Sequence, residues 1–436
     1  MRIRALTIGV LSALCANGAQ SAGFALIEQN ASGLGNAYAG QAASAQDAST
    51  IFYNPAGLTQ LEGRQVVMAG SLVRPSAKFS NDGSTNAPLQ PVLGGDGGDA
   101  GGWALVPNFY YAMDMTPAIK FGLGVNAPFG LATVYDYDWA GRFHAVKSDM
   151  KTLNINPTLA FKLNDKVSLG VGIDAQYIKA ELTNKVNYSG VFAQASKGTL
   201  IAPNIEGLAT VEGDDWSWGY NLGALLSPEA GTRIGINYRS KVKHTLEGTV
   251  DFSRPAGLSA TQTGILNAAV ADGDVTAGVE LPDTFSVSLF KTVNPKWDIL
   301  ADVTWTHWKL FKDLTVNRAN GTQLTTTPEN WDNNLRYSVG LNYHQDEKMT
   351  WRVGLAYDET PVDDAFRTPR IPDESRTWLA FGGQYRLSKK AALDFGYAHL
   401  FVKDASIDQV SASNGTLAGN YDNAVDILSM QYTHSF

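Results

Sequence analysis

Residues 167–177 read Val167-Ser168-Leu169-Gly170-Val171-Gly172-Ile173-Asp174-Ala175-Gln176-Tyr177. Apolar side chains occupy the odd-numbered positions, and small or polar side chains occupy the even-numbered ones. A period of two is that of a β-strand with one apolar face. The run is about as long as a tilted strand must be to cross the hydrocarbon of a membrane. The segment therefore predicts one strand of a transmembrane barrel.

The same alternation recurs along the chain, and the connectors between the alternating runs are short and long in turn. Alternating runs also occupy residues 119–126, 153–162 and 351–358. Short connectors lie at residues 114–118, 164–166, 227–231, 294–296, 345–348 and 388–390. Such a sequence of connectors is typical of periplasmic turns and external loops. We expect an all-β fold, a transmembrane antiparallel barrel of about fourteen strands.

Composition excludes several other classes. The chain has 436 residues, of which 44% are hydrophobic and 17% charged, with a mean hydropathy of −0.14. A bundle of membrane helices would need runs of about eighteen consecutive apolar residues, and no run after the N-terminus reaches that length. The net charge of −8 argues against a nucleic-acid partner. It does not exclude an anionic ligand, because local charge matters more than the total.

Residues 1–21 have the features of a secretory signal peptide. Arg2 and Arg4 precede an apolar run at residues 5–15, and Ala19-Gln20-Ser21 forms a cleavage site of small residues. We expect the mature chain to begin at Ala22. The only cysteine, Cys15, lies in this segment, so disulfides and thiol chemistry are excluded from the mature protein.

Residues 22–62 differ from the rest, since they are rich in alanine, glycine and serine and do not alternate. Asp47 and Asn54 are plausible helix caps, and Pro55 interrupts regular structure. We expect a hatch of short helices that plugs the lumen, followed by the barrel at residues 63–436. A barrel of about fourteen strands leaves an interior that must be filled or stay open.

The hatch sequence resembles that of the FadL/TodX family of outer-membrane transporters. The resemblance rests on Ala22-Gly23-Phe24-Ala25-Leu26, Ser32-Gly33-Leu34-Gly35-Asn36-Ala37-Tyr38-Ala39-Gly40, Asp47-Ala48 and Asn54-Pro55-Ala56. It continues through shorter matches over nearly the whole mature chain. It implies passive uptake of long-chain fatty acids across the outer membrane of a Gram-negative cell. The alternative that it leaves open is an importer of neutral aromatic or aliphatic hydrocarbons.

The resemblance also implies site residues. Pro128, Phe129 and Gly130 would form an inward kink that opens a lateral gap in the wall. The alternative is that the strand simply ends there and a loop begins. Asn54, Pro55 and Ala56 would anchor the hatch. Ligand would contact Phe24, Leu182 and Val211. The family presents cations at two positions that are the neutral Asn184 and Thr327 here, so Lys179, Lys185 or Lys309 would have to replace them at a carboxylate.

Two other classes of barrel remain as distant alternatives. An outer-membrane lipid hydrolase needs a nucleophile beside a base, and the best material is His144 with Asp136, Asp138 and Ser148 in one long connector. No G-x-S-x-G motif accompanies them. A general porin would have an open lumen, which the apolar hatch argues against. We therefore predict no catalytic residue, and the scattered histidines predict no metal site or cofactor.

The expected partners follow from this interpretation. They are a hydrophobic small molecule, the lipid and lipopolysaccharide of the outer membrane, and the barrel assembly machinery, whose terminal signal the last strand resembles because it ends in Phe436. We expect a monomer that binds no nucleic acid.

Overall fold

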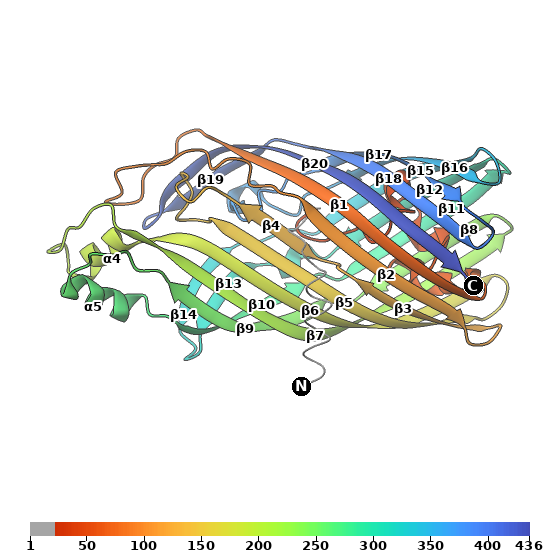
Figure 1. Ribbon diagram of the computed structural model, residues 1–436, viewed down its shortest axis with the longest axis horizontal. Helices are drawn as coiled ribbons and strands as arrows, with labels where there is room; N and C mark the ends of the chain where they lie inside the picture. The colour runs from red at the N-terminus through yellow and green to blue at the C-terminus, as the bar shows by residue number, and fades with distance from the viewer. Residues whose placement is uncertain (1–21) are drawn as a thin grey trace.

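A closed antiparallel β-barrel makes up most of the computed structural model, which describes residues 22–436 (Figure 1). The ring closes because β20 pairs with β1. Its fourteen strands are β1 (Arg64–Asn81), β2 (Ala104–Asp114), β3 (Ile119–Asn126), β5 (Lys147–Lys162), β6 (Val167–Asn187), β7 (Glu206–Glu229), β8 (Thr232–Arg239), β11 (Thr284–Asn294), β12 (Trp297–Thr306), β15 (Asn334–His344), β16 (Met349–Asp358), β17 (Arg376–Arg386), β18 (Ala391–Val402) and β20 (Gly415–Ser435). The predicted fold class is confirmed. The predicted signal peptide lies outside the described residues.

Six further strands extend the wall beyond the ring. They are β4 (Gly130–Val134), β9 (Val242–Phe252), β10 (Gly273–Leu281), β13 (Asp313–Arg318), β14 (Gln323–Pro328) and β19 (Ala405–Ser411). Helices α4 (Tyr188–Ala195) and α5 (Ala260–Ala269) lie at the long-loop end, opposite the C-terminus (Figure 1). Two short 3-10 helices, η3 (Trp308–Leu310) and η4 (Asp364–Phe366), lie in connectors. Across residues 22–436 we find no helix that combines the length and the apolar character needed to cross a membrane.

The alternation read from the sequence has the orientation of a membrane barrel. In β6, Leu169, Val171 and Ile173 are 43%, 39% and 54% exposed, whereas Gly170 and Asp174 between and beside them are buried. The apolar face of the strand therefore points away from the lumen, and the small and polar face points into it. A soluble β-sandwich has the opposite arrangement.

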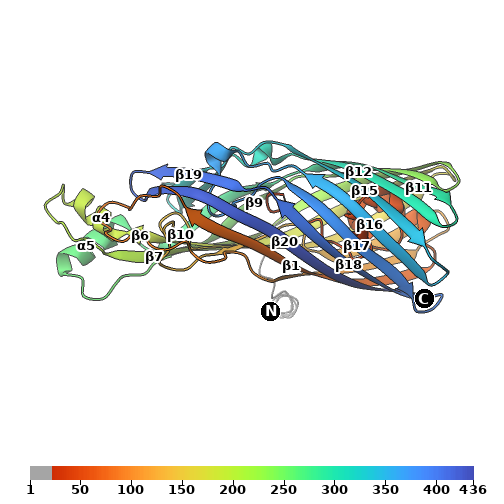
Figure 2. The ribbon, with the colours of Figure 1, turned by 90° about the horizontal axis from the view of Figure 1, so that it is seen from above.

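Residues 22–62 lie inside the barrel, where both views show the red N-terminal segment among the strands (Figures 1 and 2). The segment forms η1 (Leu34–Asn36), α2 (Gln41–Ser44), α3 (Thr50–Tyr53) and η2 (Pro55–Gln60). Almost all of its side chains are buried. We call residues 22–62 the hatch.

Glycines of the barrel wall allow the hatch backbone to pack closely against it. A Cβ added to Gly235 of β8 would lie 1.9 Å from the Ala42 carbonyl oxygen, and one added to Gly354 of β16 would lie 2.0 Å from the Asn36 carbonyl carbon. Only residues without a side chain allow the hatch backbone to approach the wall this closely. The glycine-rich inner face is therefore explained in part by contact with the hatch.

Candidate functional site

The third strand of the ring is interrupted, and the interruption leaves a break in the wall. β3 ends at Asn126 and β4 begins at Gly130, so Pro128 and Phe129 lie between them. β3 pairs with β2 only as far as Val125 opposite Phe109, and β4 pairs with β5 alone. Residues 104–108 of β2 consequently have a ladder partner on the β1 side only. Proline at position 107, which has no N–H to donate, suits such an unpaired edge.

The start of the hatch binds this interruption through its backbone. Ala25 and Phe129 form an isolated antiparallel bridge. The Leu26 N–H donates to the Pro128 carbonyl at 2.8 Å, and the Gly130 N–H donates to the Phe24 carbonyl at 2.9 Å. The first residues of the hatch therefore act as a short extra strand at the break.

A side chain from the wall holds the same segment from the other side. The Thr152 hydroxyl of β5 accepts from the Phe129 N–H at 2.9 Å and donates to the Phe129 carbonyl at 2.7 Å. The Gln29 side-chain amide of the hatch donates to the Ala127 carbonyl at 2.9 Å. Polar groups that a regular ladder would have satisfied are thus satisfied by side chains.

Phe24 sits in an aromatic box. Its ring centroid lies 4.6 Å from that of Trp308, 5.5 Å from Phe311, 5.6 Å from Trp331 and 6.2 Å from Phe129. Only 2% of Phe24 is exposed. Edge-to-face and tilted contacts are favourable for aromatic rings. The four surrounding rings form an apolar site that holds one aromatic side chain, Phe24.

An external pocket of about 280 Å³ lies on the long-loop side of this box. Its lining brings together Leu182, Asn184, Val211 and Thr327, which the sequence analysis considered as ligand-binding positions. It also includes Arg370, from the connector between β16 and β17. A narrower apolar groove of about 40 Å³ continues from it, sharing Leu182 and Val211. Ligand contact at these residues stays a prediction.

The three lysines considered as replacement cations are each paired with a carboxylate. Lys179 lies 3.8 Å from Glu212, Lys185 lies 3.1 Å from Glu206, and Lys309 lies 3.2 Å from Asp332. On β6, positions 179 and 185 are odd-numbered, whereas Leu182 and Asn184 are even-numbered, so the two sets belong to opposite faces of the strand. The structure does not bring Lys179 and Lys185 to the external pocket.

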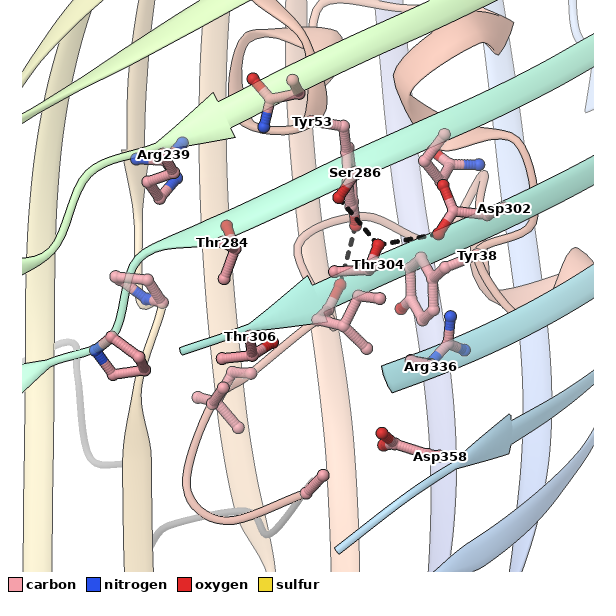
Figure 3. A pocket seen from close by; sticks show the side chains of 18 of the residues that line it. Tyr38, Tyr53, Arg239, Thr284, Ser286, Asp302, Thr304, Thr306, Arg336 and Asp358 are labelled. Atoms are coloured by element: carbon pink, nitrogen blue, oxygen red, sulfur yellow. Dashed lines mark hydrogen bonds between the residues drawn. The ribbon is translucent and has the colours of Figure 1, made fainter. Parts of the chain in front are cut away.

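A second cavity, of about 130 Å³, lies between the hatch and the wall. Figure 3 shows its polar side, where Ser286, Thr304 and Asp302 are joined by hydrogen bonds. Arg336 also lines this inner chamber and donates to the Ala37 carbonyl of the hatch at 2.7 Å. Phe129 lines it too, so the chamber reaches the break in the wall.

Asn54 joins the hatch to itself and to the wall. Its side-chain oxygen accepts from the Ala56 N–H at 3.0 Å, and its nitrogen donates to the Ala42 carbonyl at 2.6 Å and to the Ala224 carbonyl of β7 at 2.9 Å. Pro55 packs at the start of η2, where its missing N–H costs nothing. The arrangement fits the anchoring role expected of Asn54-Pro55-Ala56, which stays a prediction.

Comparison with known proteins places this arrangement in a family. Residues 12–436 match the family described as outer membrane protein transport protein (OMPP1/FadL/TodX). The chain belongs to that family. A long-chain fatty acid transport protein of Salmonella typhi is 30% identical, over 92% of this chain and 92% of its own length. A solved structure of a Pseudomonas aeruginosa FadL homologue is 28% identical, with a TM-score of 0.88 over 95% of this chain and 100% of that one.

A more distant solved structure shares the fold. The toluene transporter TbuX of Ralstonia pickettii is 20% identical, with a TM-score of 0.67 over 94% of this chain and 100% of its own. The FadL/TodX resemblance read from the sequence is confirmed. The protein is an outer-membrane transporter of hydrophobic compounds, and it is not an enzyme.

The residues considered for a hydrolase do not form a nucleophile–base pair. Burial lowers the pKa of His144 to about 4, so its imidazole is neutral near pH 7. The Ser148 hydroxyl accepts from Arg370 at 3.1 Å, and no hydrogen bond joins it to His144 within residues 22–436. The same part of the chain contains no group of three or more histidine, cysteine or acidic side chains arranged to hold a metal.

Sequence reasoning missed Arg370 and most of the aromatic box. Trp308, Phe311 and Trp331 belong to two connectors beyond β12, and only the fold brings them to Phe24. The one local signal for Arg370 is that it stands between Pro369 and Ile371-Pro372, in a rigid part of a long connector.

Proposed function

We propose that the protein mediates passive, energy-independent uptake of long-chain fatty acids. External loops capture the ligand, the lumen holds it, the hatch moves, and the ligand leaves sideways into the bilayer between β2 and β4. The observation that carries this proposal is the backbone bridge between Ala25 and Phe129, because it places the start of the hatch at the break in the wall. The 30% identity to a long-chain fatty acid transport protein supports the choice of ligand.

The attachment of the hatch start is weak enough to be reversible. Two backbone hydrogen bonds hold residues 24–26 to the break, and each contributes about 0.5–1.5 kcal/mol net. Burial of Phe24 adds about 1.5–3 kcal/mol. The Gly23 N–H also donates to the Asp373 carboxylate at 3.0 Å. An acyl chain that entered the aromatic box would replace the contacts of Phe24 and so offset part of the cost of displacing the hatch start.

Several partners belong to this proposal. The outer face of the barrel contacts outer-membrane lipid and lipopolysaccharide, and the final strand, ending in Phe436, is the segment read by the barrel assembly machinery. The transporter acts as a monomer without nucleic acid.

A second candidate ligand class is a neutral aromatic or aliphatic hydrocarbon. Asn184 and Thr327 favour it, because both line the external pocket and neither carries a charge. A neutral ligand would need no ionic partner there. Competition between oleate and toluene for uptake separates the two classes.

A disulfide across the bridge tests the hatch movement. Residues 25 and 129 form a non-hydrogen-bonded antiparallel pair, whose Cα atoms lie about 4.5 Å apart, within reach of a disulfide. Residues 22–436 contain no native cysteine. We expect Ala25→Cys/Phe129→Cys to stop uptake of labelled oleate when oxidised and to recover it with dithiothreitol.

The single variants Ala25→Cys and Phe129→Cys serve as matched controls, since neither forms the crosslink. Both should import oleate at the same rate with and without the reductant. Unchanged import by the fully crosslinked protein would show that the hatch start need not leave the break.

A further inference from the structure

Arg370 is held in place by its backbone. Thr368 and Ile371 form an isolated bridge, so residues 368–371 make a tight turn. The Thr133 hydroxyl of β4 donates to the Arg370 carbonyl at 3.1 Å, and the Tyr135 hydroxyl donates to the Pro369 carbonyl at 2.7 Å. The turn is therefore fixed to the strand segment just beyond the break in the wall.

The guanidinium of Arg370 has only neutral partners. It donates to the Lys147 carbonyl at 3.2 Å, the Ser148 hydroxyl at 3.1 Å and the Asn184 side-chain oxygen at 3.4 Å. No carboxylate of residues 22–436 lies within 4.0 Å of it. Arg367, three residues earlier, has contacts with both Asp364 and Glu374. A buried arginine without an ion-paired carboxylate is unusual, because an uncompensated buried charge is costly.

The external pocket has one charged residue among those that line it. That residue is Arg370, and His144 in the same lining is neutral near pH 7. Burial lowers the pKa of Arg370 to about 10, which still leaves it positively charged at neutral pH. Among the described residues, no carboxylate lines the pocket. Glu329, which acts electrostatically on Arg370 from outside the lining, is mostly protonated at pH 7 because burial raises its pKa to about 8.

An apolar track leads away from this cation. The pocket and the groove beyond it share Leu182, Val211, Leu314 and Val316. The groove then reaches Leu246 and Val279, which belong to the same buried cluster as Phe24. A cation at one end of an apolar track matches a molecule with an anionic head and a long hydrocarbon tail.

We propose that Arg370 binds the carboxylate of a long-chain fatty acid in the external pocket, with the acyl chain along Leu182 and Val211 towards Phe24. This inference rests on the proposed function and assigns its selectivity to a residue outside the two neutral positions, Asn184 and Thr327. The guanidinium already has its fork oriented by Lys147, Ser148 and Asn184, so little freedom is lost when a carboxylate arrives.

Binding of oleate and of oleyl alcohol, its uncharged counterpart, to the protein in lipid nanodiscs tests the assignment. We expect Arg370→Gln to weaken oleate about 10- to 150-fold, which is the range for a charged hydrogen bond. Oleyl alcohol should change less than twofold. Arg370→Lys should retain part of the affinity for oleate, since it keeps the charge and loses the fork.

A second variant keeps Arg370 in place. Asn184→Asp would put a carboxylate where the amide oxygen now accepts from Arg370, so it should weaken oleate and spare oleyl alcohol. Lys185→Gln is the matched control, because Lys185 is a cation on the same strand that is paired with Glu206. Its affinity for oleate should equal that of the wild type.

The outcomes separate this inference from the proposed function. Equal losses of oleate and oleyl alcohol in Arg370→Gln, or no loss of either, would overturn the role of Arg370 while leaving fatty-acid uptake intact. A wild-type protein that bound toluene and oleyl alcohol but not oleate would overturn the choice of fatty acid itself, and the role of Arg370 with it.

Discussion

The lumen beside the hatch body and the external pocket hold a buried arginine in different ways. Beside the hatch body, Arg352 pairs with Asp394 at 2.6 Å and Arg239 pairs with Asp174 at 2.6 Å. Both arginines also donate to the hatch, at Gln46 and at the Phe52 carbonyl. In the external pocket, no carboxylate of the described residues lies within 4.0 Å of Arg370, whereas Arg142 and Arg367 near the same loops are ion-paired. Of Arg352, Arg239 and Arg370, the fold neutralises the first two and binds them to the hatch, and among the described residues it does neither for Arg370.

The hatch follows the same division. Its body packs against wall glycines and ion-paired arginines. Its start is held by two backbone bonds at the break, by a bond from the Gly23 N–H to Asp373 and by the ring of Phe24. Local opening is expected where few buried contacts would be lost. A movable start on a fixed body is therefore what the contacts favour.

The largest effect is expected from breaking the Arg352–Asp394 ion pair beside the hatch body. Asp394→Ala would leave Arg352 buried without its anion, and loss of one partner of a buried pair costs about 3–5 kcal/mol. The temperature at which the folded barrel converts to the unfolded form on a semi-native gel measures this. Arg370→Gln is the comparison variant and should shift that temperature far less. Equal shifts would contradict the division into structural and ligand-binding arginines.

A smaller effect is expected at the break in the wall. Thr152→Val removes the hydroxyl that bonds both polar groups of Phe129, so it should destabilise the closed start of the hatch by about 1–3 kcal/mol. Hydrogen–deuterium exchange of residues 127–130 should become faster.

Thr158→Val is the matched control for this variant. Thr158 lies on the same inward face of β5, and its hydroxyl has no hydrogen-bond partner in the part of the chain that the structure describes. Exchange at residues 127–130 should not change in it. If Thr158→Val accelerated exchange as much as Thr152→Val, the effect would come from β5 in general and not from the bond to Phe129.

The sequence was sufficient for the barrel because its signal is local. Alternation of the kind seen in residues 167–177 reports which side chains face lipid, and the connector lengths report the topology. The position of the strand break at Pro128 is local as well, since proline and glycine act on their own backbone. What the break meets is not local, because the partner of Phe129 is Ala25, more than a hundred residues earlier.

Which cation faces the external pocket could not be predicted from the sequence in the same way. Lys179 and Lys185 are near Asn184 in sequence, but a period of two puts odd and even positions on opposite faces. Arg370 reaches Asn184 from a connector 186 residues away. Which of the nearby cations already has an anion depends on pairings between strands that no spacing in the chain reveals.

The smallest effect is expected from Glu329, the acidic residue that acts electrostatically on Arg370. Burial raises the pKa of Glu329 to about 8, so its carboxyl is mostly protonated at pH 7 and loses its proton as the pH rises through 8. Arg370, with a pKa of about 10, keeps its charge over that interval. The new negative charge would oppose a bound carboxylate by about 1 kcal/mol at an effective dielectric constant of ~20. Oleate affinity should therefore fall about fivefold between pH 7 and 9, and the fall should vanish in Glu329→Gln. Oleyl alcohol should show no such dependence, because it carries no charge for Glu329 to repel. A pH dependence that was the same for both ligands would place its origin in the fold of the loops and not in the field at Arg370.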